Sequence, residues 1–485
     1  MSTKSGSPGS SLAPGKVFAI VAIAVFLAQL DLFIVNIAFP AIQAGFDGAS
    51  VSDVSWVLSA YAIVYAALLV PFGKIGDIVG RRRVFIAGIL AFGVGSALCA
   101  AAPTLPFLIG ARVIQAAGAS AVTPTSLGLL LPVLSPQKRP VAIGGWAAMG
   151  AVGAAAGPPL GGVLTEINWH WIFIINVPFA LLTAVLATRV GDFRDPARPK
   201  LPDTVGTVLL IGAVVLVNLG LVKGSDWGWS SASVIGPLVG SVLLGVVFVL
   251  RTSRHSAPVL ELSILKVPAF ALSSLSAALF FAAFAAMLLS NVIYLTEVWH
   301  YSALKAGLGL TPGPVAAGMI APMAGRLVRR FGPGPVGALG SACFLVSALY
   351  WIWLMGLTPA YGTEFLPGFI IGGVGVGLVL PAFTVAATAT LPPTRLATGV
   401  GAQTMLRQVG ATLGVAAFVA ILGTPALNQI MHAFNLTRAF MAISAGVAAV
   451  ALVFVRRSML VVPAQPVAAP ADDAPAAVQA AESAA

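Results

Sequence analysis

Apolar runs about as long as a bilayer is thick recur along the whole chain. A hydrocarbon core of about 30 Å needs about 20 apolar residues in a helix. Backbone groups in lipid must be satisfied within the segment, so helices are the expected form of these runs. We predict an all-α polytopic membrane protein with 14 transmembrane helices, at 16–40, 54–72, 84–102, 105–132, 141–165, 170–190, 204–223, 232–251, 268–298, 303–325, 334–356, 364–391, 398–423 and 434–456.

The composition supports this interpretation. Hydrophobic residues make up 59% of the 485 residues and charged residues only 8%, whereas soluble domains carry about 25% charged residues. The Ser/Gly/Pro-rich residues 1–15 and the Ala/Pro-rich residues 458–485 predict disordered tails. Cys99 and Cys343 provide neither a disulfide framework nor a metal-ligand spacing. We therefore expect no metal and no cofactor.

The basic residues predict the orientation. With fourteen spans, 21 of the 26 Lys and Arg fall on the side that holds both termini. Lys223, Lys305 and Arg438 fall on the other side, and Arg112 and Arg407 lie inside spans. Positively charged loops stay cytoplasmic, so both termini are expected in the cytoplasm. Because these charges are spread over short loops, they exclude a nucleic-acid partner.

An internal repeat predicts two halves. The octapeptide GKIGDIVG (73–80) follows the second span, and GRLVRRFG (325–332) follows the tenth. Parallel repeats of this kind are typical of transporters that rock one half against the other. We predict six-helix bundles at 16–190 and 267–457, separated by an extra transmembrane hairpin with its flanking loops at 191–266.

Three charged residues lie deep in the predicted spans, where charge is costly and usually functional. Asp31 and Arg112 are expected at similar depth in the outer half of the membrane. A carboxylate that alternates between a cation and a proton can couple transport to protons, because solvation and neighbouring charge decide its protonation. The alternative is a static pair that holds two helices together. Arg407 could bind a substrate anion, cap backbone carbonyls or serve structure alone.

The stretch AVGAAAGPPLGG (151–162) is unusual for a membrane span. Gly153, Gly157 and Gly161 recur every four residues and predict one smooth helix face that lets another backbone approach closely. Pro158 removes a helix donor and crowds the carbonyl one turn back, so a bend is expected there. The alternative is a purely structural kink.

Eight short motifs occur in order along the chain. They are LDLFIVNIAFP (30–40), WVLSAY (56–61), GKIGDIVGRRR (73–83), RVIQAAG (112–118), GAAAGPPLGG (153–162), PDTVG (202–206), DWGW (226–229) and LRQVGATLGVA (406–416). With these motifs the sequence resembles the major facilitator superfamily, and within it the fourteen-helix drug:proton antiporter branch.

The resemblance implies a major facilitator fold with alternating access, and export of lipophilic or toxic compounds against inward proton flow. It implies proton coupling for Asp31 and Arg112, and it places the helix face of 153–161 against the opposite half. It also implies a cytoplasmic gate, formed by Gly73, Asp77, Gly80, Arg81, Arg82 and Arg83. Asp77 is expected to meet the positive N-terminal end of the helix that starts at Thr398.

The sequence departs from the family pattern at three positions. Phe33 stands where the first motif usually has threonine, Ile78 where the loop motif has a basic residue, and Ala116 where a glycine follows Gln115. The first change could reshape the substrate pocket and the others could soften gating. Five residues are expected to line a cavity for flat lipophilic substrates, with helix packing as the alternative: Asn36, Trp56, Tyr61, Gln115 and Arg407.

These observations predict a proton-driven efflux antiporter of the plasma (inner) membrane. The expected partners are the lipid bilayer, protons and small lipophilic substrates. The sequence does not indicate whether the protein also binds a periplasmic adaptor of a tripartite pump. A nutrient or metabolite symporter or uniporter on the same fold is the alternative. A proton-channelling respiratory subunit is less favoured, because it would need more ionisable residues inside its helices. An enzyme is not expected, because no convergent catalytic set is visible.

Overall fold

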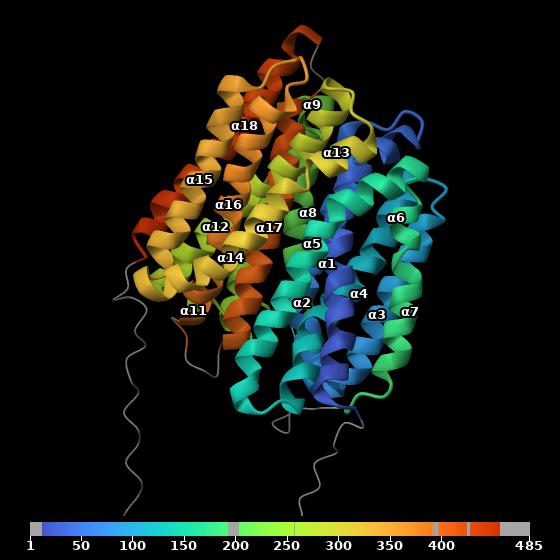
Figure 1. Cartoon of the computed structure of the whole chain (residues 1–485), viewed down its shortest axis with the longest axis vertical. Coiled ribbons are helices and arrows are strands. Elements are labelled where there is room, and N and C mark those ends of the chain that lie inside the picture. The colour runs from blue at the N-terminus through green and yellow to red at the C-terminus, as the bar shows by residue number, and fades with distance from the viewer. Residues whose placement is uncertain are drawn as a thin grey trace, which may run out of the picture.

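The computed structural model describes residues 12–192, 203–256, 258–389, 391, 396–423 and 427–455, and every regular element in these ranges is helical (Figure 1). The predicted tail at 458–485 and most of the tail at 1–15 lie outside the described residues. Helix α1 begins at Pro14, slightly before the predicted start of the first span.

The first part of the chain forms seven helices. They are α1 (Pro14–Ala44), α2 (Val51–Val79), α3 (Arg81–Ala100), α4 (Leu105–Leu130), α5 (Arg139–Ile167), α6 (Trp171–Ile174) and α7 (Asn176–Ala187). Three more helices, α8 (Thr204–Val222), α9 (Gly224–Trp227) and α10 (Ala232–Arg254), follow in the segment predicted as an inserted hairpin.

The second part forms α11 (Leu262–Leu265), α12 (Pro268–Ile293), α13 (Ala303–Gly309), α14 (Pro312–Phe331), α15 (Pro333–Leu354), α16 (Leu366–Ala389), α17 (Leu396–Leu422) and α18 (Ile430–Val453). Short π-helical turns at Tyr294–Val298 and Tyr361–Phe365 adjoin α12 and α16. Single 3-10 turns lie at Leu131–Val133, Pro136–Lys138 and Leu427–Gln429.

Twelve helices of the described ranges are long and apolar enough to cross a membrane. The other two predicted spans are divided. Residues 170–190 form α6 and α7, because Pro178 has no N–H to donate to the carbonyl of Ile174, where α6 ends. Residues 303–325 form α13 and part of α14, which starts at Pro312, a residue suited to a helix start. The count of fourteen therefore stays a prediction.

The two repeated octapeptides form the same kind of junction. Gly80 joins α2 directly to α3 with φ +122°, and Gly332 joins α14 directly to α15 with φ +92°. Glycine adopts such angles without the steric cost that other residues pay. At Gly80, a Cβ atom would also lie 2.5 Å from a carboxylate oxygen of Asp192. Both repeats thus end in a sharp helix-to-helix turn.

The helices gather on two sides of the molecule. In Figure 1, α1, α3, α4, α5 and α7 lie to the right, and α12, α14, α15, α16 and α18 lie to the left. Helix α1 packs mainly on α5, and α3 on α4; on the other side α15 packs on α16 and α18, and α12 on α17 and α18. Helices α2 and α17 pack against each other between the two sides, and α8 contacts both of them. The predicted bundle boundaries at 16–190, 191–266 and 267–457 stay a prediction.

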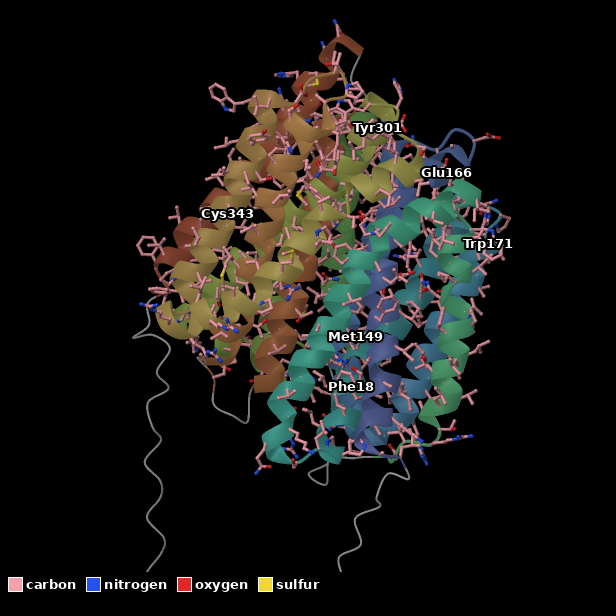
Figure 2. The ribbon with its side chains drawn as sticks, viewed as in Figure 1. Phe18, Met149, Glu166, Trp171, Tyr301 and Cys343 are labelled. Carbon is pink, nitrogen blue, oxygen red and sulfur yellow. The ribbon has the colours of Figure 1, made fainter. Side chains whose placement is uncertain are left out.

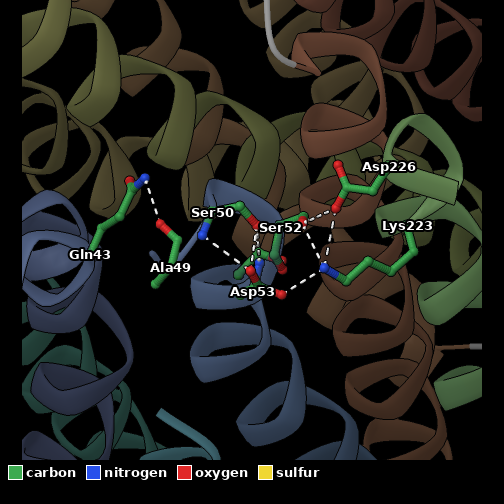
Figure 3. Close-up of polar contacts among 8 residues, drawn as sticks. Gln43, Ala49, Ser50, Ser52, Asp53, Lys223 and Asp226 are labelled. Atoms are coloured by element: carbon green, nitrogen blue, oxygen red, sulfur yellow. Dashed lines mark hydrogen bonds and ion pairs between the residues drawn. The ribbon is translucent and has the colours of Figure 1, made fainter. Parts of the chain in front are cut away.

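One polar cluster fastens the end of α8 to the start of α2 (Figure 3). Nζ of Lys223 lies 2.6 Å from Oδ1 of Asp53 and 3.1 Å from Oδ2 of Asp226. Ser52 donates to the same Asp226 oxygen at 2.8 Å. A capping box formed by Ser50 and Asp53 begins α2 at this point. These contacts attach the α8–α10 pair to the N-terminal end of α2.

Candidate functional site

The two deep charges of the first half form a buried ion pair. Nη1 of Arg112, on α4, lies 2.6 Å from Oδ2 of Asp31, on α1, and the two side chains are 1% and 0% exposed. An isolated charge in such a place would be costly, so each side chain stabilises the charge of the other. The structure thus brings together the two residues that the sequence placed at similar depth. Their predicted role in proton coupling stays a prediction.

Three more polar side chains complete this site. Gln115 donates to Oδ1 of Asp31 at 2.7 Å and accepts from Nη1 of Arg112 at 2.6 Å. Asn176, on α7, donates to the same Asp31 oxygen at 3.1 Å, and Ser96, on α3, lies 2.6 Å from Nε2 of Gln115. We call Asp31, Ser96, Arg112, Gln115 and Asn176 the Asp31 cluster.

Sequence reasoning missed Ser96 and Asn176. Both are single polar residues in apolar runs, and both are fully buried. An asparagine in the middle of the run 170–190 is a signal that could have been used, because buried amides need hydrogen-bond partners. Four helices, α1, α3, α4 and α7, each supply part of the Asp31 cluster. The cluster therefore depends on how those four helices pack.

Aromatic residues extend the site along α2. The guanidinium carbon of Arg112 lies 4.0 Å from the ring centroid of Tyr61. Tyr61 stacks on Tyr65, with the ring planes 9° apart. Tyr61 and Gln115 were predicted to line a substrate cavity; here they are 1% and 0% exposed and pack inside the first half.

The remaining predicted cavity residues lie in different places. Asn36 is nearly buried and donates to the carbonyl of Leu32 in its own helix at 3.0 Å. Trp56 packs, partly buried, on the main hydrophobic core. Arg407, on α17, lies with its guanidinium carbon 4.2 Å from the ring centroid of Phe281 on α12. Among these three residues, Arg407 is the one that makes a cation–π contact, and its charge makes it the candidate for binding a charged ligand.

The predicted gate residues 73–83 form the end of α2, the turn at Gly80 and the start of α3 rather than a loop, and several of their contacts lie in the first half. Asp77 pairs with Arg81 at 2.8 Å, and Arg81 also donates to the carbonyl of Gly128 at 3.0 Å. Arg82 donates its backbone N–H to Asp192 at 3.1 Å. Arg83 lies 3.9 Å from the same carboxylate.

Two further contacts of the gate residues bear on the prediction. Gly73 lies against Pro124 of α4, with a Cβ at that position falling 3.4 Å from the proline Cβ. Lys74 donates to the carbonyl of Pro258 at 2.9 Å, so the end of α2 also reaches the segment after α10. The predicted partner of Asp77 is the N-terminal end of α17, which begins at Leu396 instead of Thr398, and the side chains of its first three residues lie outside the described residues. That contact stays a prediction.

The glycine face of α5 corrects one prediction. A Cβ at Gly153 would lie 2.5 Å from the carbonyl oxygen of Phe26, one at Gly157 would lie 2.7 Å from Cβ of Phe33, and one at Gly161 would lie 3.1 Å from the carbonyl oxygen of Ile34. All three partners are on α1. The face therefore packs within the first half, and the prediction that it meets the opposite half is wrong.

A neighbouring face of α5, which includes Pro158 of the predicted seam, meets the second half. A Cβ at Gly162 would lie 2.8 Å from the carbonyl of Ala303, and one at Gly307 would overlap the carbonyl of Pro158. Glu166 accepts a hydrogen bond from the backbone N–H of Leu304 at 3.1 Å. Figure 2 shows Glu166 and Tyr301 at the same end of the molecule, far from Phe18. We call the contact of α5 with α13 the α5–α13 seam.

Arg438 is more deeply buried than its place among the charges opposite the termini suggested. It lies in the first half of α18, within the predicted span 434–456, and is 3% exposed. It donates to the carbonyl of Trp351 at 3.3 Å, near the end of α15, and to Oδ1 of Asn435 at 2.8 Å. A cation at a helix C-terminus complements the helix dipole, which explains this burial in structural terms.

Comparisons with known proteins agree with this architecture. The sequence profile described as Major Facilitator Superfamily matches residues 21–415. A tetracenomycin C resistance and export protein of Streptomyces glaucescens is 32% identical over 423 residues, which cover 84% of this chain and 76% of that protein. The multidrug resistance protein Stp of Mycobacterium tuberculosis is 31% identical over 401 residues, or 82% of this chain and 74% of that protein.

The fold is also found among solved structures. A crystal structure of the peptide transporter POT in complex with sulfate has a TM-score of 0.66 and 16% identity, and the match covers 89% of this chain and 93% of that one. At this identity the likeness concerns the fold alone. Taken with the profile match and with the twelve apolar helices, these findings show that the chain is a multi-pass membrane transporter and belongs to the Major Facilitator Superfamily.

Proposed function

We propose that this transporter is a proton-driven antiporter that exports lipophilic, toxic compounds by alternating access across the plasma (inner) membrane. The Asp31 cluster is the observation that carries the proposal. Asp31 has no exposed surface and accepts hydrogen bonds from Arg112, Gln115 and Asn176. Relatives named for resistance, export and multidrug resistance support the direction of transport.

The cluster suggests how a proton could drive the cycle. When Asp31 takes up a proton, the ion pair with Arg112 is lost and a buried cation remains without its counter-charge. Breaking a buried pair in this way costs about 3–5 kcal/mol. Since Asp31 is on α1 and Arg112 on α4, a shift of these helices would relieve that cost. Proton uptake would thereby change which conformation of the transporter is favoured.

We propose fourteen spans with both termini in the cytoplasm. In this arrangement α6 with α7, and α13 with α14, form the two spans that complete the twelve long apolar helices to fourteen. Single cysteines at Ser5 and Ala476, in a background without Cys99 and Cys343, would react with impermeant maleimide only after the cells are opened. Reaction of either cysteine in intact cells would overturn the topology.

The decisive experiment is transport in proteoliposomes with an imposed pH gradient. Purified full-length protein would be tested with a panel of dyes, antibiotics and organic acids, with the gradient in either direction. We expect substrate movement opposite to the proton flow, and movement in the same direction would indicate a symporter instead.

A pair of variants ties this activity to Asp31. Asp31→Asn should abolish gradient-driven transport, because the neutral amide cannot exchange a proton, while the protein still folds and inserts. Asp47→Asn is the matched control, since Asp47 is an exposed carboxylate after α1. Gradient-driven transport at the wild-type rate in Asp31→Asn would remove Asp31 from the mechanism.

A further inference from the structure

Helix α17 carries two buried donors one turn apart. Nε of Arg407 and Nε2 of Gln403 have no acceptor in the part of the chain that the structure describes. Gln403 is 3% exposed, so its amide is withdrawn from solvent. Residues four apart lie on the same face of a helix, and buried polar groups in proteins normally have a partner. The two donors therefore point to an acceptor that the described residues do not supply.

The packing of α17 places these donors beside an aromatic ring. At Gly410 and Gly414, any Cβ would overlap the backbone of Ala278 and Ala282, so α17 is pressed directly onto α12. Arg407 precedes Gly410 by one turn, and its guanidinium carbon lies 4.2 Å from the ring centroid of Phe281. An arginine held against a ring face keeps its N–H donors in its own plane, where they remain able to bind a carboxylate or a carbonyl.

An aromatic wall continues from this point to the first half of the protein. Phe281 contacts Phe284 with ring centroids 5.8 Å apart, and Phe284 contacts Phe33 of α1 with centroids 6.2 Å apart. Phe33 and Phe284 are only half-buried. Aromatic rings favour stacked and edge-to-face contacts with other rings. The wall thus offers a flat ligand an aromatic surface next to Arg407, one helical turn from Gln403.

We propose that Arg407, Gln403 and the wall of Phe33, Phe281 and Phe284 form a binding subsite for flat aromatic compounds that carry an anionic or carbonyl oxygen group. This inference rests on the proposed function, because it names the substrate class of the exporter. The guanidinium binds the charged oxygen, the Gln403 amide donates to a second oxygen, and the rings contact the aromatic body. A dication is disfavoured, because it would bring like charge next to Arg407.

Equilibrium binding tests this subsite without any proton gradient. The full-length protein in phosphatidylcholine nanodiscs is titrated at neutral pH with anthraquinone-2-carboxylate and with its uncharged methyl ester, and quenching of tryptophan fluorescence is measured. We expect the carboxylate to bind about tenfold or more tightly than the ester, as a charge-assisted hydrogen bond to the partly buried Arg407 requires. Equal binding of the two probes by the wild type would overturn the proposal.

Variants assign the preference to named residues. Arg407→Gln should bring the two affinities together, Arg407→Lys should keep part of the preference, and Gln403→Met should weaken both probes. Thr404→Val is the matched control, because Thr404 bonds to its own helix at Val400 and should bind as the wild type does. A carboxylate preference that survives Arg407→Gln, in protein with an unchanged melting temperature, would overturn the subsite. The proposed antiport is judged separately, because loss of gradient-driven transport leaves this binding ratio unaffected.

A lipid headgroup is the other source of an anionic oxygen. Titrations repeated in nanodiscs with phosphatidylglycerol separate the two sources. Unchanged carboxylate affinity supports a substrate subsite. Competition by phosphatidylglycerol that disappears in Arg407→Gln would assign the site to lipid and overturn the substrate class proposed here.

Discussion

The ring of Tyr61 stacks on the ring of Tyr65, with centroids 6.1 Å apart and planes 9° apart. Tyr61 also meets the guanidinium of Arg112 at 4.0 Å, and both tyrosines lie on α2, which packs on α4 and on α17. The two tyrosines therefore lie between the Asp31 cluster of the first half and the proposed subsite of the second. A movement of Arg112 would therefore directly change its contact with the Tyr61 ring, which in turn contacts Tyr65.

Two substitutions of Tyr61 distinguish the contribution of its ring to transport from that of its hydroxyl. Tyr61→Leu should impair gradient-driven transport, because Arg112 loses a cation–π contact of about 1–2 kcal/mol in a desolvated place. Tyr61→Phe should transport nearly as well as the wild type, since the Tyr61 hydroxyl has no partner among the described residues. Initial transport rates and melting temperatures of both variants provide the check. Equal losses in the two variants would show that the hydroxyl, and not the ring, matters.

The α5–α13 seam should limit proton leak. Gly307→Val would force α13 away from the Pro158 carbonyl of α5, because packed interfaces tolerate little added volume. We expect the variant to insert but to collapse an imposed pH gradient faster, as reported by a pyranine dye inside proteoliposomes. Gly318→Val is the control, since no atom lies within 4 Å of a Cβ at that position. Equal leak in both variants would show that the seam does not seal the protein.

Asp77 should affect the rate of the cycle more than stability. The Asp77 and Arg81 side chains are 30% and 29% exposed, and such i,i+4 pairs contribute about 0.3–0.5 kcal/mol. Asp77→Asn should therefore leave the melting temperature nearly unchanged, yet slow transport several-fold with little loss of substrate binding. Asp77→Glu, which keeps the charge, should restore part of the rate.

A reporter cysteine tests whether this effect is gating. Gly144→Cys places a thiol on an open part of α5, where a Cβ meets no other atom within 4 Å. In a background without Cys99 and Cys343, maleimide labelling of this site should differ between protein that keeps Asp77 and protein that carries Asp77→Asn. Identical labelling would argue against a gate at residues 73–83.

The cluster around Lys223 has a predictable pH dependence. Burial lowers the pKa of Lys223, but its hydrogen bonds to Asp53 and Asp226 outweigh burial and raise that pKa above the usual value of 10.5. Because the pKa is raised by folding, the stabilisation is fully present below pH 10.5 and is lost as the pH rises through the higher folded value. Lys223→Met should lower stability by about 1 kcal/mol at neutral pH.

Melting curves against pH provide the measurement for Lys223. The difference between wild type and Lys223→Met should shrink as the pH rises above 10.5. In a background with Asp53→Asn and Asp226→Asn, the same substitution should cost much less, because its partners are then uncharged. An undiminished cost in that background would show that Lys223 acts through packing alone.

The sequence by itself determined the helical class, the apolar spans and the order in which they occur. Hydropathy is a local property of a run of side chains, so most predicted spans coincide with single helices. The depth of Asp31 and Arg112 was also readable, because it follows from rise per residue along each helix. Breaks at Pro178 and Pro312 could have been read from the missing backbone donors.

Only the tertiary structure decided which faces meet. In lipid the outer face of a helix and its packed face are both apolar, so hydropathy cannot tell which side of α5 faces α1 and which faces α13. For the same reason the sequence missed Asn176 and Ser96 as members of the Asp31 cluster and did not reveal that Arg438 is buried. Those residues become neighbours of their partners only when distant helices pack, since each contact depends on two segments at once and is not encoded in either segment alone.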